Sequence, residues 1–395
     1  MSTTSRTGTR TLLTALTASG ALLLASCATF DESDAGGQWQ AAPELTPERG
    51  PQPDLPEAQG RAEQEGNERD SIPPPDGCTD HDPAVIATCL DPVGAVAALP
   101  SMGVEVAALA GERESGTLYR ATNGAEPEEV TTLDVDAAGD GGLTGLALSP
   151  SYDSDQLVYA YITTEEDNRV VRFAADSDPS PVLTGIPKGE QGNAGALATD
   201  PDGALLVATG NAGDPEAAAD PDSLAGKVLR IDDTGDPAAG NPRAGSPVIA
   251  SGLHSPGGLC STADGSRSWV TDRAPDADRL HHIEPGEDLS NPAWTWEDRP
   301  GVAGCADWSD MVMVTASQAG NVQTMPIDPD GTITAEPHVV GEDDGLGYGR
   351  ISDVDLITEE VAVAGTVNRA GGDPVSSDDR VVLLPRPEAA AGGAD

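Results

Sequence analysis

Short apolar runs separated by polar turns repeat along most of the chain. The fullest copy lies in residues 193–242, where an apolar run from Gly195 precedes a Pro-Asp-Gly turn, the run ALLVATG, an acidic loop and the run GKVLRID. Runs of about four to eight apolar and β-branched residues, bounded by Gly, Pro and Asp, are typical of β-strands. This stretch therefore predicts three strands of one antiparallel sheet.

Weaker copies of this unit follow one another, at irregular spacing, between about residues 80 and 388. The third strand of the unit is the clearest, and it is predicted at 117–120, 170–173, 228–231, 280–283, 322–325 and 381–384. First strands are predicted in the strings AVAALP, GLALSP, GALATDP, GGLCSTA and SDVDLIT, with a weaker one near residues 311–315. Residues 214–224 are acidic and interrupted by prolines, and we expect a loop there.

A single sheet of this kind cannot bury both of its faces, so its copies must stack around a closed ring. The six copies predict an all-β fold, a six-bladed β-propeller of four-stranded antiparallel blades. Two β-sandwiches are the alternative, and six copies of one unit argue against them. A closed ring leaves no long free strand edge, so we expect a monomer.

The N-terminus resembles a bacterial lipoprotein signal. Arg6 and Arg10 precede an apolar run at residues 11–24 that is too short for an ordinary transmembrane helix, and the string LASC follows, ending at Cys27. We therefore expect Cys27 to carry a lipid and the protein to sit at the cell membrane, lipid-anchored on the extracytoplasmic face. An ordinary secretory signal with an accidental Cys is the alternative.

The chain divides into four predicted segments. Residues 1–26 are the lipoprotein signal peptide, and residues 27–77 are the lipidated Cys with a disordered linker rich in Pro and Glu. Residues 78–388 form the propeller, and residues 389–395 form a flexible tail.

The composition is strongly acidic, with 21 Lys and Arg against 67 Asp and Glu and a formal net charge of -46. Nucleic-acid binding needs basic side chains that displace counterions from phosphates, so we exclude that class of partner. Lys188 and Lys227 are the only lysines.

Four cysteines follow Cys27, and four cysteines allow three pairings. An exported protein can form disulfides, and no two of these cysteines have the C-x-x-C spacing of a redox or metal site. We favour the pairs that are closest in sequence, Cys78–Cys89 and Cys260–Cys305.

Several strings resemble one enzyme family in the order in which they occur. They are GLALSPSYDSDQLVYAYIT, GALATDPDGALLVATGNAGDP, SLAGKVLRID, GNP, GLHSPGGL and GRISDV. They resemble the soluble glucose/sorbosone dehydrogenases, six-bladed propellers that use pyrroloquinoline quinone (PQQ), over about residues 99–385. The resemblance implies a channel His that removes the sugar hydroxyl proton, basic residues that bind the PQQ carboxylates, and calcium that polarises the quinone.

The position of the family's base is changed in this chain. The family segment H-x-G-G-R-L corresponds to residues 192–197, so Gly192 stands where the His is expected. Glycine cannot accept a proton, and the nearest candidates to replace the base are Asn193 and Glu190.

The positions implied to bind PQQ are also mostly changed. The Arg and Asn of G-L-R-N-P-x-G-L become His254 and Ser255, while Arg350 of GRISDV is retained. The candidate cofactor-binding residues are Arg350, His254, Ser255, Asn193 and Gln318, which falls on the family's fifth-blade Lys. His254 and Asp140, which aligns with an early acid or amide of the family, are the candidate catalytic residues.

In the calcium segment Asp278 matches, but Arg279 and His281 replace an acid and an Asn. Calcium prefers oxygen ligands, so a cation at a ligand position weakens such a site. His281 and His282 alternate on a strand and cannot bind one ion from the same side. Trp294 matches a family Trp that either walls the pocket or belongs to the core.

These substitutions favour a non-catalytic or ligand-binding propeller whose ligand is a small sugar or another small molecule. The alternative is an active quinoprotein sugar dehydrogenase that oxidises an aldose hydroxyl in a rearranged pocket. A hydrolase or lactonase that uses the channel and calcium is a third hypothesis.

Overall fold

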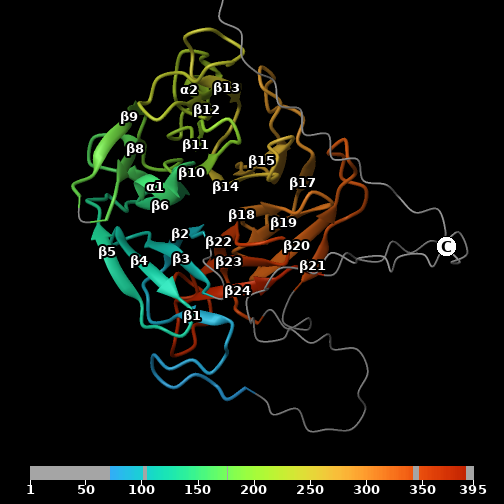
Figure 1. Cartoon of the computed structure of the whole chain (residues 1–395). Coiled ribbons are helices and arrows are strands. Elements are labelled where there is room, and N and C mark those ends of the chain that lie inside the picture. The colour runs from blue at the N-terminus through green and yellow to red at the C-terminus, as the bar shows by residue number, and fades with distance from the viewer. Residues whose placement is uncertain (1–71, 101–104, 176, 341–346, 388–395) are drawn as a thin grey trace, which may run out of the picture. The chain divides into compact units, whose positions relative to one another are not determined.

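The strands form six separate four-stranded antiparallel sheets, arranged as a β-propeller around a common axis (Figure 1). Residues of all six sheets line a cavity on this axis, within what we call the channel. The computed structural model describes residues 72–100, 105–175, 177–340 and 347–387. The predicted fold class is therefore confirmed. The signal peptide, Cys27, most of the linker and the C-terminal tail lie outside the described residues.

The first three blades are built from consecutive strands. Blade 1 contains β2 (Val93–Ala98), β3 (Ala107–Glu112), β4 (Thr117–Thr122) and β5 (Glu128–Thr132). Blade 2 contains β6 (Leu143–Leu148), β7 (Val158–Thr163), β8 (Asn168–Phe173) and β9 (Ser180–Ile186). Blade 3 contains β10 (Gly195–Thr199), β11 (Leu205–Thr209), β12 (Lys227–Ile231) and β13 (Val248–Ser251).

The other three blades complete the ring. Blade 4 contains β14 (Pro256–Ser261), β15 (Ser268–Arg273), β16 (Asp278–His282) and β17 (Trp294–Trp296). Blade 5 contains β18 (Val302–Asp307), β19 (Met311–Ala316), β20 (Asn321–Pro326) and β21 (His338–Val340). Blade 6 contains β22 (Ile351–Leu356), β23 (Val361–Thr366), β24 (Val381–Pro385) and the N-terminal strand β1 (Val85–Ala87).

The six predicted third strands are confirmed as β4, β8, β12, β16, β20 and β24. The first strand predicted near residues 311–315 is wrong, because that segment is β19, the second strand of blade 5. The inner strand is β18, whose sequence VAGCAD is too rich in small residues to stand out as a strand. A Cβ on Gly304 would lie 2.7 Å from the backbone nitrogen of Val354, so the close approach of β22 requires small residues there.

Two short helices interrupt the β-structure of the described residues. They are α1 (Tyr152–Asp155) and α2 (Pro215–Ala219). The loop predicted at residues 214–224 is therefore partly wrong. Asp214 caps α2 by accepting hydrogen bonds from the backbone N–H groups of Glu216 and Ala217, at 2.9 and 3.2 Å. No helix of the described residues has the length and apolar character needed to cross a membrane.

The inner strands β2, β6, β10, β14, β18 and β22 surround the channel and run in the same direction along it. The Thr144 hydroxyl, at the start of β6, donates to the carbonyl of Gly195 at the start of β10 (2.9 Å). The Thr199 hydroxyl, at the end of β10, donates to the carbonyl of Leu148 at the end of β6 (2.8 Å). We call the end of the channel where these strands begin the mouth, and the opposite end the inner end.

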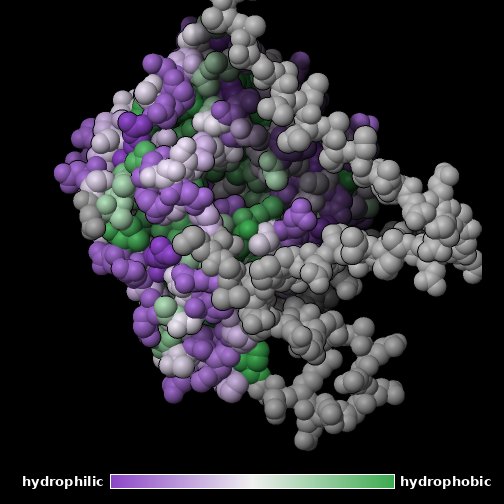
Figure 2. All heavy atoms as spheres, in the orientation of Figure 1, coloured by the Kyte–Doolittle hydropathy of each residue, from purple (hydrophilic) through white to green (hydrophobic). Residues whose placement is uncertain are grey.

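Val, Leu, Ile and Ala fill the spaces between the blades, with Trp269, Tyr161 and Phe173 among the largest buried side chains. Figure 2 shows hydrophilic residues around the rim of the molecule and hydrophobic residues nearer its hollowed centre. Both predicted disulfides are confirmed: Cys78–Cys89 lies in the N-terminal segment, and Cys260–Cys305 joins the inner strands β14 and β18.

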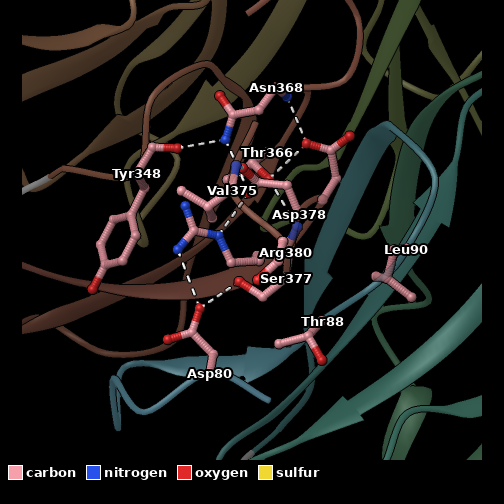
Figure 3. A network of polar contacts seen from close by, with 12 residues as sticks. Asp80, Thr88, Leu90, Tyr348, Thr366, Asn368, Val375, Ser377, Asp378 and Arg380 are labelled. Atoms are coloured by element: carbon pink, nitrogen blue, oxygen red, sulfur yellow. Dashed lines mark hydrogen bonds and ion pairs between the residues drawn. The ribbon is translucent and has the colours of Figure 1, made fainter. Parts of the chain in front are cut away.

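The N-terminal segment closes the ring on blade 6, where β1 pairs with β24. Asp80 accepts hydrogen bonds from the Ser377 hydroxyl at 2.7 Å and from the Arg380 guanidinium at 3.3 Å. Arg380 also donates to Asp378 at 2.7 Å, and Asn368 donates to the same carboxylate at 3.0 Å (Figure 3). This buried network of hydrogen bonds holds the segment that precedes β1 against blade 6.

Candidate functional site

One carboxylate at the mouth connects three blades. Asp140 precedes β6, and it accepts hydrogen bonds from the backbone N–H groups of Gly192 and Asn193, both at 3.0 Å. It also accepts one from the hydroxyl of Ser255 at 3.1 Å. Gly192 and Asn193 precede β10, and Ser255 precedes β14. The structure therefore brings together three residues that the sequence singled out, Asp140, Asn193 and Ser255.

His254 is held by a buried carboxylate next to this cluster. Its backbone N–H donates to Asp272 at 2.9 Å, and its ring nitrogen Nδ1 lies 3.3 Å from the other carboxylate oxygen. Asp272 is completely buried, whereas the His254 side chain is 34% exposed. The hydrogen bond with Asp272 raises the pKa of His254. With Nδ1–H donated to Asp272, Nε2 is the nitrogen that can act on a ligand.

Asp272 and the adjacent Arg273 were not predicted as site residues. Asp272 also accepts the backbone N–H of Ser255 at 2.8 Å, and the Arg273 guanidinium lies 3.4 Å from the Ser255 hydroxyl. Hairpin register could have identified both residues, because Pro256 at the start of β14 pairs with Asp272 near the end of β15. In any antiparallel hairpin, the end of the second strand lies beside the start of the first.

The backbone at Gly192 has no room for a side chain. Its φ is +74°, in the region that favours glycine. A Cβ there would lie 2.8 Å from Oδ1 of Asn211 and 3.0 Å from the backbone nitrogens of Ala212 and Gly213. The position that aligns with the family's base therefore lacks a His, and the surrounding atoms leave no space for a side chain there.

The two candidates near Gly192, Asn193 and Glu190, do not replace the base. The Asn193 side chain is buried and bonds back to the backbone of Gly189, accepting its N–H and donating to its carbonyl, both at 2.9 Å. It therefore braces its own loop, and only its backbone N–H reaches the Asp140 carboxylate. Glu190 is exposed.

Arg350 precedes β22 at the start of blade 6, and Gln318 lies between β19 and β20 of blade 5. The Arg350 guanidinium donates to the carbonyl of Ala370 at 3.1 Å. Gln318 is exposed in the turn after β19, and its side chain lies against Gly301. Among the described residues, neither side chain forms a hydrogen bond or ion pair with the Asp140 cluster.

In the segment that aligns with the calcium site, the charged side chains bind other groups of the protein. The buried Asp278 carboxylate accepts the backbone N–H groups of Gly301 and Val302, at 2.6 and 3.1 Å. Arg279 pairs with Asp276 at 2.7 Å. Within the part of the chain that the structure describes, no group of three or more His, Cys, Asp or Glu side chains could hold a metal ion.

The adjacent histidines face opposite sides of β16, as their alternation predicts. His281 is buried, and neither ring nitrogen has a partner within the described residues; burial lowers the pKa of its imidazole to about 4. His282 is half-buried, with its ring centroid 5.1 Å from that of Trp269. Trp294 packs against the hydrophobic core between blades 4 and 5, which favours the core interpretation.

The donor set at the mouth does not fit PQQ with calcium. PQQ carries three carboxylates, so its pocket needs guanidinium or ammonium groups with free donors. The Arg113 guanidinium donates to the carbonyl of Gly141 at 2.8 Å, and Arg273 is directed toward Ser255. The carboxylates of Asp140 and Asp272 add negative charge in the same place.

Comparison with known proteins identifies the relatives of this chain. A family model described as Glucose / Sorbosone dehydrogenase matches residues 95–303. The aldose sugar dehydrogenase YliI of Escherichia coli K12 is 26% identical over 182 residues, which are 41% of this chain and 49% of that protein. The match thus spans about half the length of that curated relative.

Solved structures match over more of the chain. The PQQ-bound aldose sugar dehydrogenase of Streptomyces coelicolor is 31% identical with a TM-score of 0.70, covering 76% of this chain and 96% of that one. A putative oxidoreductase (glucose dehydrogenase) of Thermus thermophilus is 27% identical with a TM-score of 0.68, covering 76% of this chain and 98% of that one.

Proposed function

The chain belongs to the glucose/sorbosone dehydrogenase family, and from that premise we propose that it is a non-catalytic member whose channel binds a small ligand. The observation that carries this proposal is the closed backbone at Gly192, where a Cβ would meet an atom at 2.8 Å. Loss of a positioned general base lowers an enzymatic rate by about 10²–10⁴-fold.

The charges at the mouth support the same proposal. Two of the positions implied to bind PQQ carry His254 and Ser255 in place of Arg and Asn. Losing one buried contact between an Arg and a carboxylate costs about 2–5 kcal/mol of affinity. The loss of such a contact at His254, beside the carboxylate of Asp140, strongly reduces the expected affinity for a trianionic cofactor.

An active sugar dehydrogenase is the second candidate function, and the pair formed by His254 and Asp272 favours it. A buried carboxylate that bonds Nδ1 orients an imidazole so that Nε2 can accept a proton from a substrate hydroxyl. In this hypothesis, His254, which lies on the neighbouring blade, takes the role of the missing base. Its raised pKa shifts the neutral, basic form of the ring to higher pH than in an ordinary His.

Cofactor titration of the full chain, solubilised in detergent, separates the two candidates. PQQ and calcium are added while the quinone absorbance is followed, and dye reduction is measured with glucose and other aldoses. We expect no stoichiometric binding at high micromolar PQQ and no turnover. Turnover that is lost in His254→Ala but kept in the matched variant His338→Ala, an exposed His on β21, would establish the second candidate instead.

We further propose that the protein is exported, lipid-anchored through Cys27 and monomeric. The support is the basic start, the short apolar run and the string LASC at residues 24–27. Labelling of cells with a palmitate analogue should tag the wild-type chain and leave Cys27→Ser unlabelled. Light scattering of the purified chain should give the mass of one copy.

A further inference from the structure

A cavity of about 380 Å³ lies in the channel, toward the inner end. All six inner strands contribute to its lining, which continues into the segments that follow β6, β10 and β14. The mouth residues Asp140, His254, Ser255 and Arg350 do not line it. The cavity therefore has a different lining from the candidate site at the mouth.

The charged residues that line this cavity are all acidic. Its lining contains four aspartates, and none of the described residues that line it is Lys, Arg or His. Asp200 is neutralised by Arg230 at 2.5 Å, and Asp307 by Arg267 at 2.8 Å. The other two aspartates are Asp353 and Asp355.

Asp353 and Asp355 lie two positions apart on β22, so their side chains point to the same side of the strand. Asp353 accepts the backbone N–H of Val96 at 2.9 Å, and Asp355 accepts that of Ala98 at 2.8 Å. Both donors belong to β2, the adjoining inner strand. Within the described residues, neither carboxylate has a cationic partner.

An ionised carboxylate in a cavity is costly when no cation balances it. Burial accordingly raises the pKa of both groups, that of Asp353 to about 7. Backbone N–H groups supply one hydrogen bond to Asp353 and two to Asp355, the second from Leu356 at 2.8 Å, but they supply no positive charge. The cavity thus has room for a small molecule and two acceptors that favour a charged donor.

We propose that the inner-end cavity binds a small organic amine in its protonated form through Asp353 and Asp355. An ammonium group offers three N–H donors and no acceptor, which matches carboxylates and the carbonyls of the surrounding strand edges. Ligand pockets have volumes of about 300–1,000 Å³, so this cavity suits a compact ligand. Neutral sugars leave both charges unbalanced, and anions are repelled. This binding is independent of whether the mouth is catalytic.

A matched set of ligands tests the proposal on the unmodified full chain in detergent. Isothermal titration calorimetry at pH 8 compares 1,4-diaminobutane as its dication, 1,4-butanediol as the neutral molecule of similar length, and succinate as the dianion. We expect saturable binding of one diaminobutane per chain and no binding of the other two. Equal binding of the diamine and the diol, or binding of none of the three, would overturn the proposal.

Variants then locate the site. Asp353→Asn combined with Asp355→Asn keeps an acceptor for the β2 backbone but removes both charges, and we expect at least a tenfold loss of diamine affinity. Asp330→Asn, at an exposed turn carboxylate, is the matched control and should keep the wild-type affinity. Circular dichroism verifies folding, and if the double variant does not fold, the two single variants replace it. Undiminished affinity in folded variants without these charges would refute the assignment.

Discussion

The two ends of the channel hold carboxylates in opposite situations. At the mouth, Asp140 accepts three hydrogen bonds and Asp272 also accepts three, one of them from the His254 ring. At the inner end, Asp353 and Asp355 accept backbone N–H groups of β2 and have no cation among the described residues. Carboxylates of this molecule therefore either hold neighbouring loops in place or keep acceptors without a cationic partner among the described residues. What differs is the set of donors around them.

The strongest test of the mouth is Asp272→Ala. This change leaves two buried backbone N–H groups and the His254 ring without their acceptor, and each unsatisfied buried group costs about 1–3 kcal/mol. We expect a loss of about 3 kcal/mol of unfolding free energy, read as a lower melting temperature by calorimetry. A melting temperature equal to that of the Asp330→Asn control would mean that Asp272 does not brace the mouth.

The closed loop at the mouth is tested by Gly192→His. A side chain at φ +74° that also meets atoms at 2.8 Å should cost about 1–3 kcal/mol in backbone strain and displacement. We expect a less stable protein and no gain of PQQ-dependent dye reduction. Gly192→Ala is the control, because it carries the same φ penalty with less bulk. A stable, active Gly192→His variant would show that the loop can open.

The inner end is tested by the pH dependence of Asp353→Asn. The pKa of Asp353 in the folded protein is raised to about 7 from its ordinary value of 3.8. The contribution of Asp353 to wild-type stability is therefore fully present below about pH 4 and is lost as the pH rises through 7. The variant should lack this loss and be more stable at pH 8, by on the order of 2 kcal/mol, but not at pH 4.

The other titratable groups of this cavity must be considered in that experiment. Asp200 and Asp307 are held in ion pairs, so Asp355 is the group most strongly linked to Asp353. Thermal melts of the wild type, Asp353→Asn and Asp355→Asn across pH 4–8 separate their contributions. Identical pH profiles for all three proteins would contradict an uncompensated charge at the inner end.

The smallest expected effect comes from His254→Gln at the mouth. Asp272 raises the pKa of His254, so the protonated ring stabilises the fold below its ordinary pKa of 6.5, and this contribution is lost as the pH rises through the folded value. Since the side chain is 34% exposed, solvent screening limits the effect to about 0.5 kcal/mol. The variant should lose stability at pH 5.5 but not at pH 9. His338→Gln, at an exposed His, serves as the control.

Strand patterning predicted much of the architecture, and its errors have physical causes. The third strands are rich in Val, Leu and Ile because they are buried between blades, so they stand out in the sequence. The inner strand β18 does not, since β14 and β22 approach it so closely that Gly and Ala are needed. The pairing of β1 with β24 joins opposite ends of the described chain, and no local pattern encodes such a contact.

The candidate site was predicted only in part. Asp140, His254 and Ser255 were found by their alignment with family strings, and the structure places them together at the mouth. Asp272 was not predicted, because only the pairing of β14 with β15 brings its carboxylate beside His254 and Ser255. Arg350 and Gln318 were also predicted from family positions, yet their side chains make other contacts in the described structure.

By itself, the sequence determined the repeat, the all-β class, the family and the pairing of cysteines that are near in sequence. Those features depend on short-range patterns and on strings that a family shares. Only the tertiary structure decided what each carboxylate does. The donors of Asp140 lie up to 115 positions away, and the β2 donors of Asp353 and Asp355 lie 257 positions away. Blade packing sets those distances, and through them it sets which charges are satisfied and which remain open to a ligand.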